Sequence, residues 1–297
     1  MLMAYNCCSL ARRSAMSVRL TASLVGVAGV IFLLNASTAL AKDRADCDRS
    51  YQPKFGQRGK DVSWEPTGSS VAAAMLQLAK TTSRDRVYDL GAGDGAIVIV
   101  AAKQFGATAI GVEYDPALAR LAQCYIEAAG VADKAKVIEG DVFKTDFSSA
   151  TVVTLFMTDS VDVALRPTIL NMTPGTRIIS HNHKMAEWKW DGEVQREGEK
   201  AYLWIVPAKV QGTWEFKESK GSDSFTLALQ QRFQMLTGSA QVNGKQSSLT
   251  GSLSGSDISI DLGGQRKLTG KIDNKEISAT VSDGRSARQY VGREAKR

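Results

Sequence analysis

The sequence predicts an α/β fold with a Rossmann-like, doubly wound parallel sheet, followed by a small antiparallel all-β domain. The segment Arg86–Gly95 begins as an apolar strand and ends in three alternate glycines, and Ile97–Lys103 continues without a helix breaker. A strand that passes through a glycine-rich turn into a helix is the first unit of such a sheet. From Gly221 onward, short runs alternate apolar and polar residues between Asn-Gly, Gly-Gly and Asp-Gly turns, which is the pattern of an antiparallel meander, either a sandwich or a partial barrel.

Residues 1–41 have the pattern of a secretory signal peptide. Leu20–Leu34 is a short apolar run that follows three arginines, and Ala39-x-Ala41 comes after it. We expect cleavage after Ala41 and an exported or periplasmic protein, with an uncleaved N-terminal anchor as the alternative. The cleaved chain keeps 34 basic and 31 acidic residues, which gives no electrostatic footprint for nucleic acid.

The remaining chain divides by composition. Residues 42–61 are polar and contain a proline and two glycines, so we expect a linker there. Residues 62–217 carry the α/β pattern, and residues 221–297 form the predicted β-rich accessory domain. The domain at 221–297 shows no catalytic constellation, so we interpret it as a binding, oligomerising or structural part.

Local signals place the elements of the α/β domain. Thr67, Ser69 or Ser70 can cap a helix with an apolar face, and Asp115-Pro116 can start another. Strands are expected at 135–141, 150–157 and 175–180, with a helix over 161–172. Strands over 202–206 and 210–216 are expected to pair as a hairpin at the edge of the sheet.

Cysteines and histidines give weak signals. Cys47 and Cys124 remain after cleavage and could form one disulfide, but they provide no framework and no zinc spacing. His181 and His183 follow a predicted strand without a third ligand, so we expect no metal there and interpret His181 as a substrate-facing residue.

The glycine turn predicts a nucleoside cofactor. Glycines 91, 93 and 95 allow close backbone approach to a ligand, and the next strand ends at Glu113, where an acid can accept both hydroxyls of a ribose. Asp89 stands two residues before the first glycine, where a carboxylate would repel a pyrophosphate but accept from a cationic ammonium. A nicotinamide-dependent oxidoreductase is therefore a disfavoured alternative.

These residues resemble motif I of the class I methyltransferases that use S-adenosylmethionine. Residues 62–207 are more specifically similar to the mitochondrial lysine methyltransferases that modify the adenine nucleotide translocase and the ATP synthase c-subunit, and to their bacterial relatives. The chain keeps Pro66-Thr67 of that family's entry loop, with Gly68 in place of a second proline. It has Ala92 and Ala96 where the family has serine and arginine.

The resemblance implies a role for each part of the site. Asp89, Ala92 and the backbone of Gly91, Gly93 and Gly95 would hold the methionine part of the cofactor, Glu113 the ribose, and Asp141 with Val142 the adenine. The acceptor would be a protein lysine. Pro66, Thr67 and His181 are then the residues on the acceptor side. If the acceptor is an amine, a nearby acid can take the departing proton, and Glu65 and Asp159 are our own candidates for that role.

A second hypothesis follows from the signal peptide. S-adenosylmethionine is made in the cytosol, whereas the leader directs the chain out of it. The chain could therefore be an exported cofactor-binding or envelope interaction protein with a degenerate methyltransferase domain that acts through its β-rich tail.

Overall fold

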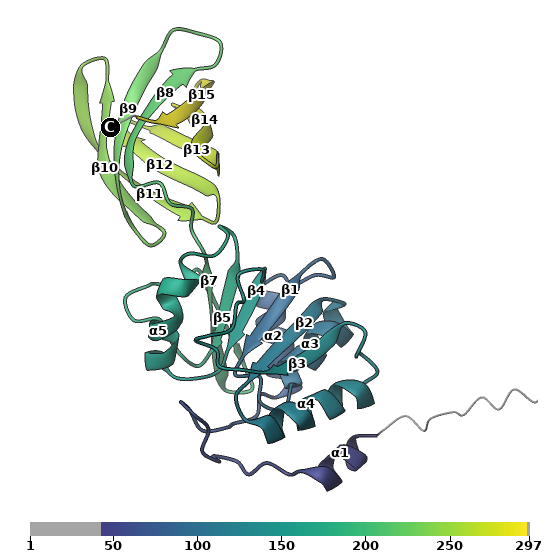
Figure 1. Cartoon of the computed structure of the whole chain (residues 1–297). Helices are drawn as coiled ribbons and strands as arrows, with labels where there is room; N and C mark the ends of the chain where they lie inside the picture. The colour runs from purple at the N-terminus through teal and green to yellow at the C-terminus, as the bar shows by residue number, and fades with distance from the viewer. Residues whose placement is uncertain (1–42, 296–297) are drawn as a thin grey trace, which may run out of the picture. The chain divides into compact units, whose positions relative to one another are not determined.

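The computed structural model describes residues 43–295, so the predicted signal peptide lies outside the described residues. The chain forms a seven-stranded mixed sheet with helices and, after it, a closed eight-stranded barrel (Figure 1). This agrees with the predicted fold class.

The sheet has the strand order β3-β2-β1-β4-β5-β7-β6. Five parallel strands come first along the chain: β1 (Arg86–Leu90), β2 (Thr108–Glu113), β3 (Ala135–Glu139), β4 (Val152–Leu155) and β5 (Arg177–His181). The antiparallel strands β6 (Gly192–Arg196) and β7 (Glu199–Ile205) complete the sheet beside β5. The strand order reverses between β1 and β4, which is the position where open α/β sheets bind ligands.

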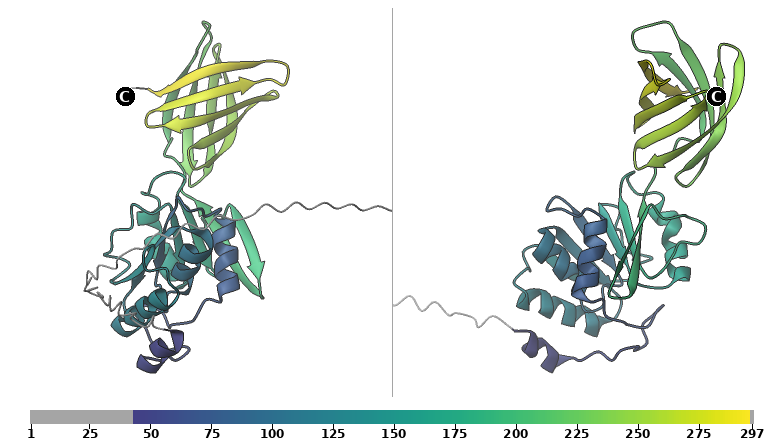
Figure 2. Two further views of the ribbon diagram at one scale, coloured as in Figure 1. Left: turned by 90° about the vertical axis from the view of Figure 1, so that its right-hand side faces the viewer. Right: turned by 180° about the vertical axis from the view of Figure 1, so that it is seen from behind.

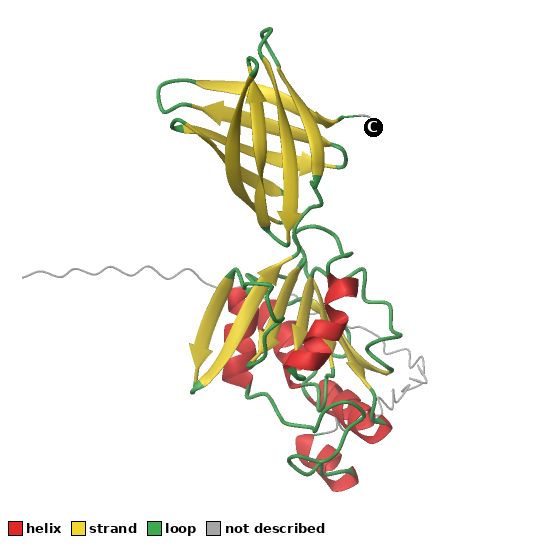
Figure 3. Ribbon diagram, turned by 90° about the vertical axis from the view of Figure 1, so that its left-hand side faces the viewer, coloured by secondary structure: helices red, strands yellow, loops and turns green. Residues whose placement is uncertain are grey.

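Helices cover both faces of the sheet (Figure 3). One apolar cluster joins α2 (Ser69–Leu78) and α3 (Ala96–Phe105) to the face that carries Val87, and the other joins α5 (Asp159–Ile169) to the face that carries Tyr88 and Leu90. Consecutive strand residues point to opposite faces, so a strand buried on both sides must be apolar throughout. This is why the parallel strands contain almost continuous apolar runs.

The helix α4 (Pro116–Ala128) begins where the sequence predicts it. The carboxylate of Asp115 accepts hydrogen bonds from the backbone N–H groups of Ala117 at 2.7 Å and Leu118 at 3.3 Å. Pro116 occupies the first turn, where its missing N–H leaves no hydrogen bond unmade.

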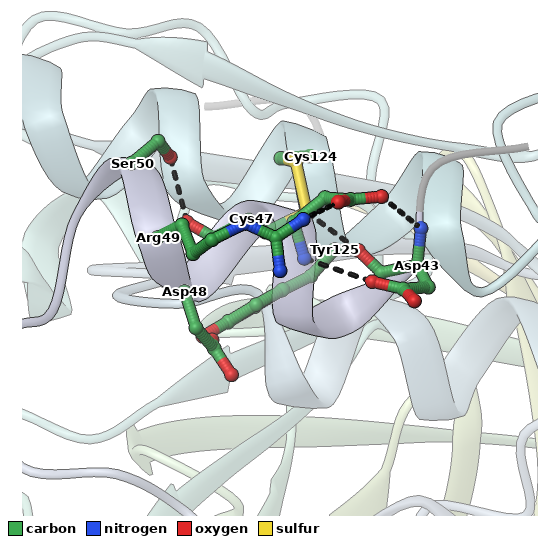
Figure 4. Close-up of a disulfide and its surroundings, with 8 residues drawn as sticks. Asp43, Cys47, Asp48, Arg49, Ser50, Cys124 and Tyr125 are labelled. Atoms are coloured by element: carbon green, nitrogen blue, oxygen red, sulfur yellow. Dashed lines mark hydrogen bonds and ion pairs between the residues drawn. A yellow bond between two sulfur atoms is a disulfide. The ribbon is translucent and has the colours of Figure 1, made fainter.

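The predicted linker at 42–61 needs correction, because it contains the helix α1 (Arg44–Ser50). Cys47 on α1 forms a disulfide with Cys124 on α4, and the side chain of Tyr125 donates a hydrogen bond to Asp48 on the same helix pair (Figure 4). Both cysteines pack with Leu121 and Tyr125 in a small apolar cluster. The disulfide that the sequence allowed is therefore present, and it ties the start of the described chain to α4.

The expected hairpin of 202–206 with 210–216 is wrong. Strand β7 pairs with β5 and β6, whereas the next strand, β8, pairs with β9 and β15 of the barrel. Pro207 removes a backbone donor directly after β7, which ends the pairing there. The predicted domain limits at 217 and 221 remain predictions, but β8 belongs to the barrel.

The barrel is an antiparallel meander closed by pairing of its first and last strands (Figure 2). Its strands are β8 (Gly212–Glu218), β9 (Ser224–Arg232), β10 (Met235–Val242), β11 (Lys245–Ser254), β12 (Asp257–Gly263), β13 (Arg266–Asp273), β14 (Glu276–Ser282) and β15 (Ala287–Glu294). Alternate residues, among them Leu227, Ile260 and Leu268, form one apolar cluster inside. Side chains thus fill the interior, as expected for a barrel of this strand number.

Among residues 43–295, no helix combines the length and the apolar character needed to cross a membrane.

The disulfide predicts a measurable contribution to stability. Cys124→Ser should lower the free energy of unfolding by roughly 2–4 kcal/mol, because the bridge constrains the unfolded chain over a separation of 77 residues. Denaturant titrations with and without reductant measure this difference. Reductant should destabilise the wild-type protein and leave Cys124→Ser unchanged; equal stability of both proteins without reductant would contradict the prediction.

Candidate functional site

A pocket lies at the carboxyl ends of the parallel strands. It holds about 820 Å³ of space, including its open mouth. Most of the predicted site residues line it: Glu65, Thr67, Asp89, Gly91, Ala92, Gly93, Glu113, Asp141 and Val142. The structure therefore brings together residues that lie up to 77 positions apart in the sequence.

The glycine turn forms the floor of this pocket. Gly91, Gly93 and Gly95 have φ values of 80°, 55° and 80°, a conformation that side chains with a β-carbon rarely adopt. The backbone N–H groups of Gly91 and Ala92 donate to the carbonyl of Val112 at 2.9 and 3.0 Å, which fixes the turn against β2. Gly95 caps α3 without lining the pocket.

Gly95 serves the packing of two helices. A β-carbon at Gly95 would lie 3.1 Å from the β-carbon of Ala122 on α4. The third glycine therefore lets α3 and α4 approach each other, while the first two face the pocket.

Glu113 braces the glycine turn from the end of β2. Its carboxylate accepts from the backbone N–H of Gly93 at 2.8 Å and from that of Asp115 at 2.8 Å. The side chain is buried, and this burial raises its pKa, while the two backbone donors oppose the rise. Glu113 thus has a structural task in addition to the ribose contact predicted from the sequence.

Asp89 lies at the end of β1 and is only 3% exposed. The hydroxyl of Thr154 on β4 donates to its carboxylate at 2.7 Å, and no Lys or Arg among the described residues forms an ion pair with it. Burial without a cationic partner raises the pKa of Asp89 to about 7. A cation placed in the pocket would restore the ionised form.

Asp141 follows β3 at the other end of the pocket. The backbone N–H of Phe143 donates to its carboxylate at 3.0 Å, and Nζ of Lys60 lies 3.1 Å from Oδ2. The Phe143 donor and the Lys60 charge lower the pKa of Asp141, so this acid is ionised.

Lys60 belongs to a short hairpin over residues 56–64, which we call the N-terminal hairpin. Hydrogen bonds join Gly56 to Trp64 at 2.9 Å and Gly59 to Val62 at 3.0 Å. Residues 59–64 all line the pocket, and the indole of Trp64 lies so close to Gly93 that a β-carbon there would be 2.7 Å from Nε1. The N-terminal hairpin is therefore one wall of the pocket, and sequence reasoning did not assign it.

The predicted acceptor-side residues separate into two groups. Thr67 lines the pocket, and its Oγ1 lies 3.3 Å from Nδ1 of His181, which is 3% exposed. The expected capping of α2 by Thr67, Ser69 or Ser70 is wrong: the N-cap is Gly68, which has no side chain to accept a hydrogen bond, and the Thr67 hydroxyl contacts the histidine instead. Pro66 is exposed and does not line the pocket.

The two predicted proton acceptors differ in position. Glu65 lines the pocket and is exposed. Asp159 does not line it: its carboxylate accepts from the backbone N–H of Lys184 at 2.9 Å and contacts Nδ1 of His183 at 3.1 Å. The Lys184 donor is the main reason that the pKa of Asp159 is lowered.

Several lining residues were not among the predicted site residues. Phe156 and Met157 follow β4, Tyr114 follows Glu113, and Lys60 and Trp64 come from the N-terminal hairpin. The position of the first three at strand ends is a signal for them, because ligands bind at that edge. Nothing in the local sequence indicates that residues 56–61 of the predicted linker fold back over the glycine turn.

This chemistry fits a nucleoside with a cationic amino-acid part. The glycine turn lets a ligand approach the backbone closely. Glu113 ends β2 and Asp141 follows the neighbouring strand β3, so both acids lie at the same edge of the sheet. The buried Asp89 has no cationic partner within the described part of the chain. No group of three or more His, Cys, Asp or Glu side chains within residues 43–295 could hold a metal ion. Fold and site together define a class I methyltransferase.

Comparison with known proteins agrees with this class. The family model for the ANTKMT methyltransferase domain matches residues 89–192. A protein-lysine N-methyltransferase of Saccharolobus islandicus is 42% identical over 129 residues, which cover 43% of this chain and 80% of the relative. The mouse lysine N-methyltransferase of the ATP synthase c-subunit is 32% identical over 109 residues, which cover 36% of this chain and 44% of the mouse protein.

The chain therefore belongs to the ANTKMT family of S-adenosylmethionine-dependent methyltransferases. A solved RNA methyltransferase from Salinibacter ruber, in complex with S-adenosylhomocysteine, has 43% sequence identity and a TM-score of 0.48. That likeness covers 49% of this chain and 96% of the other. The family matches give no support to the nicotinamide alternative.

The bracing role of Glu113 is testable without any ligand. Glu113→Ala should lower the free energy of unfolding by about 2–3 kcal/mol, because the buried N–H of Gly93 and the partly buried N–H of Asp115 lose their acceptor. Urea denaturation of the purified protein measures this change. Glu139→Ala is the matched control, since Glu139 is exposed at the end of the neighbouring strand. A loss no larger than that of the control would contradict the bracing role.

Proposed function

We propose that this protein transfers a methyl group from S-adenosylmethionine to the ε-amino group of a protein lysine. The observation that carries the proposal is the pocket in which Asp89, the glycine turn and Glu113 meet, in a chain of this methyltransferase family. The names of the two relatives support lysine as the acceptor.

Residues at the ends of different strands would bind different parts of the cofactor. Asp89 and the backbone of Gly91–Gly93, including Ala92, would hold the methionine part, Glu113 the ribose, and Asp141 with Val142 the adenine. Gly95 would act indirectly, by placing α3 against α4. When bound, S-adenosylmethionine supplies a methyl group on a positive sulfur, and this sulfur keeps the electron pair of the broken bond as a neutral thioether.

Asp89 makes binding dependent on pH. Its pKa of about 7 lies above the usual value of 3.8, so near pH 7 a large fraction of the free protein carries a proton on this group. An ammonium in the pocket favours the ionised carboxylate and lowers that pKa. The proton is then released on binding, and affinity rises with pH through the neutral range until Asp89 is ionised in the free protein.

We place the acceptor end of the pocket near Phe156 and Met157, which follow β4. A lysine reaches the reaction as an ammonium, which has no lone pair, so the enzyme must remove a proton. Burial beside Phe156 and Met157 would disfavour the charged amine, and Thr67 or Glu65 would meet it at the wall of the pocket. Asp159, which holds His183 and the Lys184 backbone, remains a candidate only from the sequence.

Calorimetry can test the Asp89 assignment. Titrations of S-adenosylmethionine at pH 7 in buffers of different ionisation enthalpy should show release of a proton, up to about half an equivalent, because the pKa of Asp89 is about 7. Asp89→Asn should bind more weakly and release none. Asp162→Asn is the matched control: Asp162 is buried with a pKa of about 7 but does not line the pocket. Proton release that persists in Asp89→Asn would contradict the assignment.

Mass spectrometry can test the acceptor. We expect purified protein and deuterium-labelled S-adenosylmethionine to add labelled methyl groups to lysines of envelope proteins from cells that lack this protein. Glu113→Ala, which should not bind the cofactor, is the control. Label on arginine, histidine or nucleic acid, with none on lysine, would refute lysine as the acceptor.

We further propose that the protein works outside the cytosol. The Cys47–Cys124 disulfide supports this, because structural disulfides persist in oxidising compartments and are rare in the cytosol. Alkylation of intact cells followed by reduction should find both cysteines protected. Two free thiols in the cellular protein would contradict an oxidising location.

A further inference from the structure

A chain of three side chains leads from the pocket to the protein surface. Thr67 lines the pocket, and its Oγ1 lies 3.3 Å from Nδ1 of His181. Nε2 of His181 lies 3.5 Å from Oε2 of Glu199, whose side chain is 46% exposed. The histidine in the middle is almost fully buried, so the chain connects two environments that are otherwise separated.

The neighbouring residues fix this chain in place. The ring of Phe156, which lines the pocket, packs on the His181 ring with centroids 4.0 Å apart. Asn182 donates from its side chain to Glu199, accepts from the backbone N–H of Lys200 at 2.9 Å and donates its own N–H to the Lys200 carbonyl at 2.7 Å. Asn182 has a φ of 61°, a conformation that asparagine tolerates better than most residues. The end of β5 is thus shaped to hold Glu199 next to His181.

The partners determine the direction of the hydrogen bonds. Nε2 of His181 is buried and makes no hydrogen bond among the described residues, and the Glu199 carboxylate 3.5 Å away is an acceptor, so we assign the ring hydrogen to Nε2. In neutral histidine Nδ1 is then the acceptor, and the Thr67 hydroxyl donates to it. The Thr67 oxygen has no second hydrogen-bond partner among residues 43–295 and can accept from a group in the pocket.

We propose that Thr67, His181 and Glu199 form a proton relay that deprotonates the acceptor ammonium; this rests on the proposed function. The ammonium gives one proton to Oγ1 of Thr67 as the hydroxyl proton of Thr67 passes to Nδ1 of His181. The Nε2 proton of His181 passes to Glu199 and from there to water. The amine keeps its lone pair for the bond to the methyl carbon, and the relay returns to its initial state when the ring tautomer is restored.

The charges around His181 suit this task. Burial lowers its pKa, so the ring is neutral and can accept a proton at pH 7. Glu199 on β7 opposes this shift, and His183, which is paired with Asp159 on α5, adds to it. Thr67 alone would contact the acceptor, whereas His181 and Glu199 are positioning residues that act through it.

The experiment measures methyl transfer from radiolabelled S-adenosylmethionine to poly-L-lysine between pH 6 and 9. Calorimetric titration with S-adenosylmethionine accompanies each variant and reports whether the fold and the cofactor site are intact. Thr67→Val removes the hydroxyl at constant shape, and Thr67→Ser restores it. His183→Asn is the matched control, because this neighbouring histidine is outside the relay.

We expect Thr67→Val to lower kcat by at least roughly tenfold and Thr67→Ser to stay within about threefold of the wild-type protein, with cofactor affinity unchanged in both. His181→Asn can accept from Thr67 but cannot carry a proton, so its kcat should also fall by at least roughly tenfold. Glu199→Gln cannot accept the Nε2 proton, so kcat should fall; the pKa of His181 also falls further, so the acid limb of the pH–rate profile should move to lower pH. His183→Asn should retain that limb in place or move it slightly to higher pH.

Four results would overturn the relay. Thr67→Val with wild-type kcat would show that the hydroxyl is not needed, and an acid limb unmoved in Glu199→Gln would show that His181 does not control it. Loss of the limb in Glu65→Gln would assign the proton to Glu65 instead. A wild-type protein that binds the cofactor but methylates no lysine at any pH would overturn the lysine acceptor and the relay with it, whereas failure to bind the cofactor would overturn the proposed function itself.

Discussion

The structure depends most on a carboxylate that is buried without a cation. Asp89 lies at the end of the central strand, accepts one hydrogen bond from Thr154 and is ionised only at a cost. Such a group is expensive to keep in a folded protein unless a ligand compensates it. In the proposed function, the methionine ammonium of S-adenosylmethionine would supply the missing charge. The glycine turn and Glu113 line the same pocket as Asp89.

The remainder of the pocket is built by segments that contact one another only in the folded state. Glu113 holds the glycine turn through the Gly93 amide, and the N-terminal hairpin covers it from the other side through Trp64. The Cys47–Cys124 disulfide anchors the chain just before this hairpin. One wall of the cofactor site therefore follows a helix that is covalently tied to α4, which links stability in an oxidising environment to the integrity of the pocket.

The fold, and the meeting of most candidate site residues in one pocket, could be predicted because their signals are local. Asp89, the glycines and Glu113 stand at fixed distances from strand ends, and parallel strands bring their carboxyl ends to one edge. The Lys60–Asp141 ion pair and the Thr67–His181 contact join residues 81 and 114 positions apart, and no periodicity encodes such pairings. The sequence pattern places strand β8 in the wrong sheet for the same reason, since alternation predicts a strand but not its partner. Asp159 shows a second limit of sequence-based prediction. It follows β4 as expected, but its side chain contacts His183 and the Lys184 backbone instead of lining the pocket.

The charge state of Asp89 in the free and ligand-bound protein decides the proposed role of this residue, and NMR can observe it directly. A titration of the carboxyl carbon of Asp89 in ¹³C-labelled protein should give a pKa of about 7 without ligand. The same titration in the presence of saturating S-adenosylhomocysteine, which retains the ammonium, should give a pKa well below that value. An ordinary carboxyl pKa in the free protein, or a raised pKa that the ligand leaves unchanged, would contradict the assignment of Asp89 as the partner of the cofactor's ammonium.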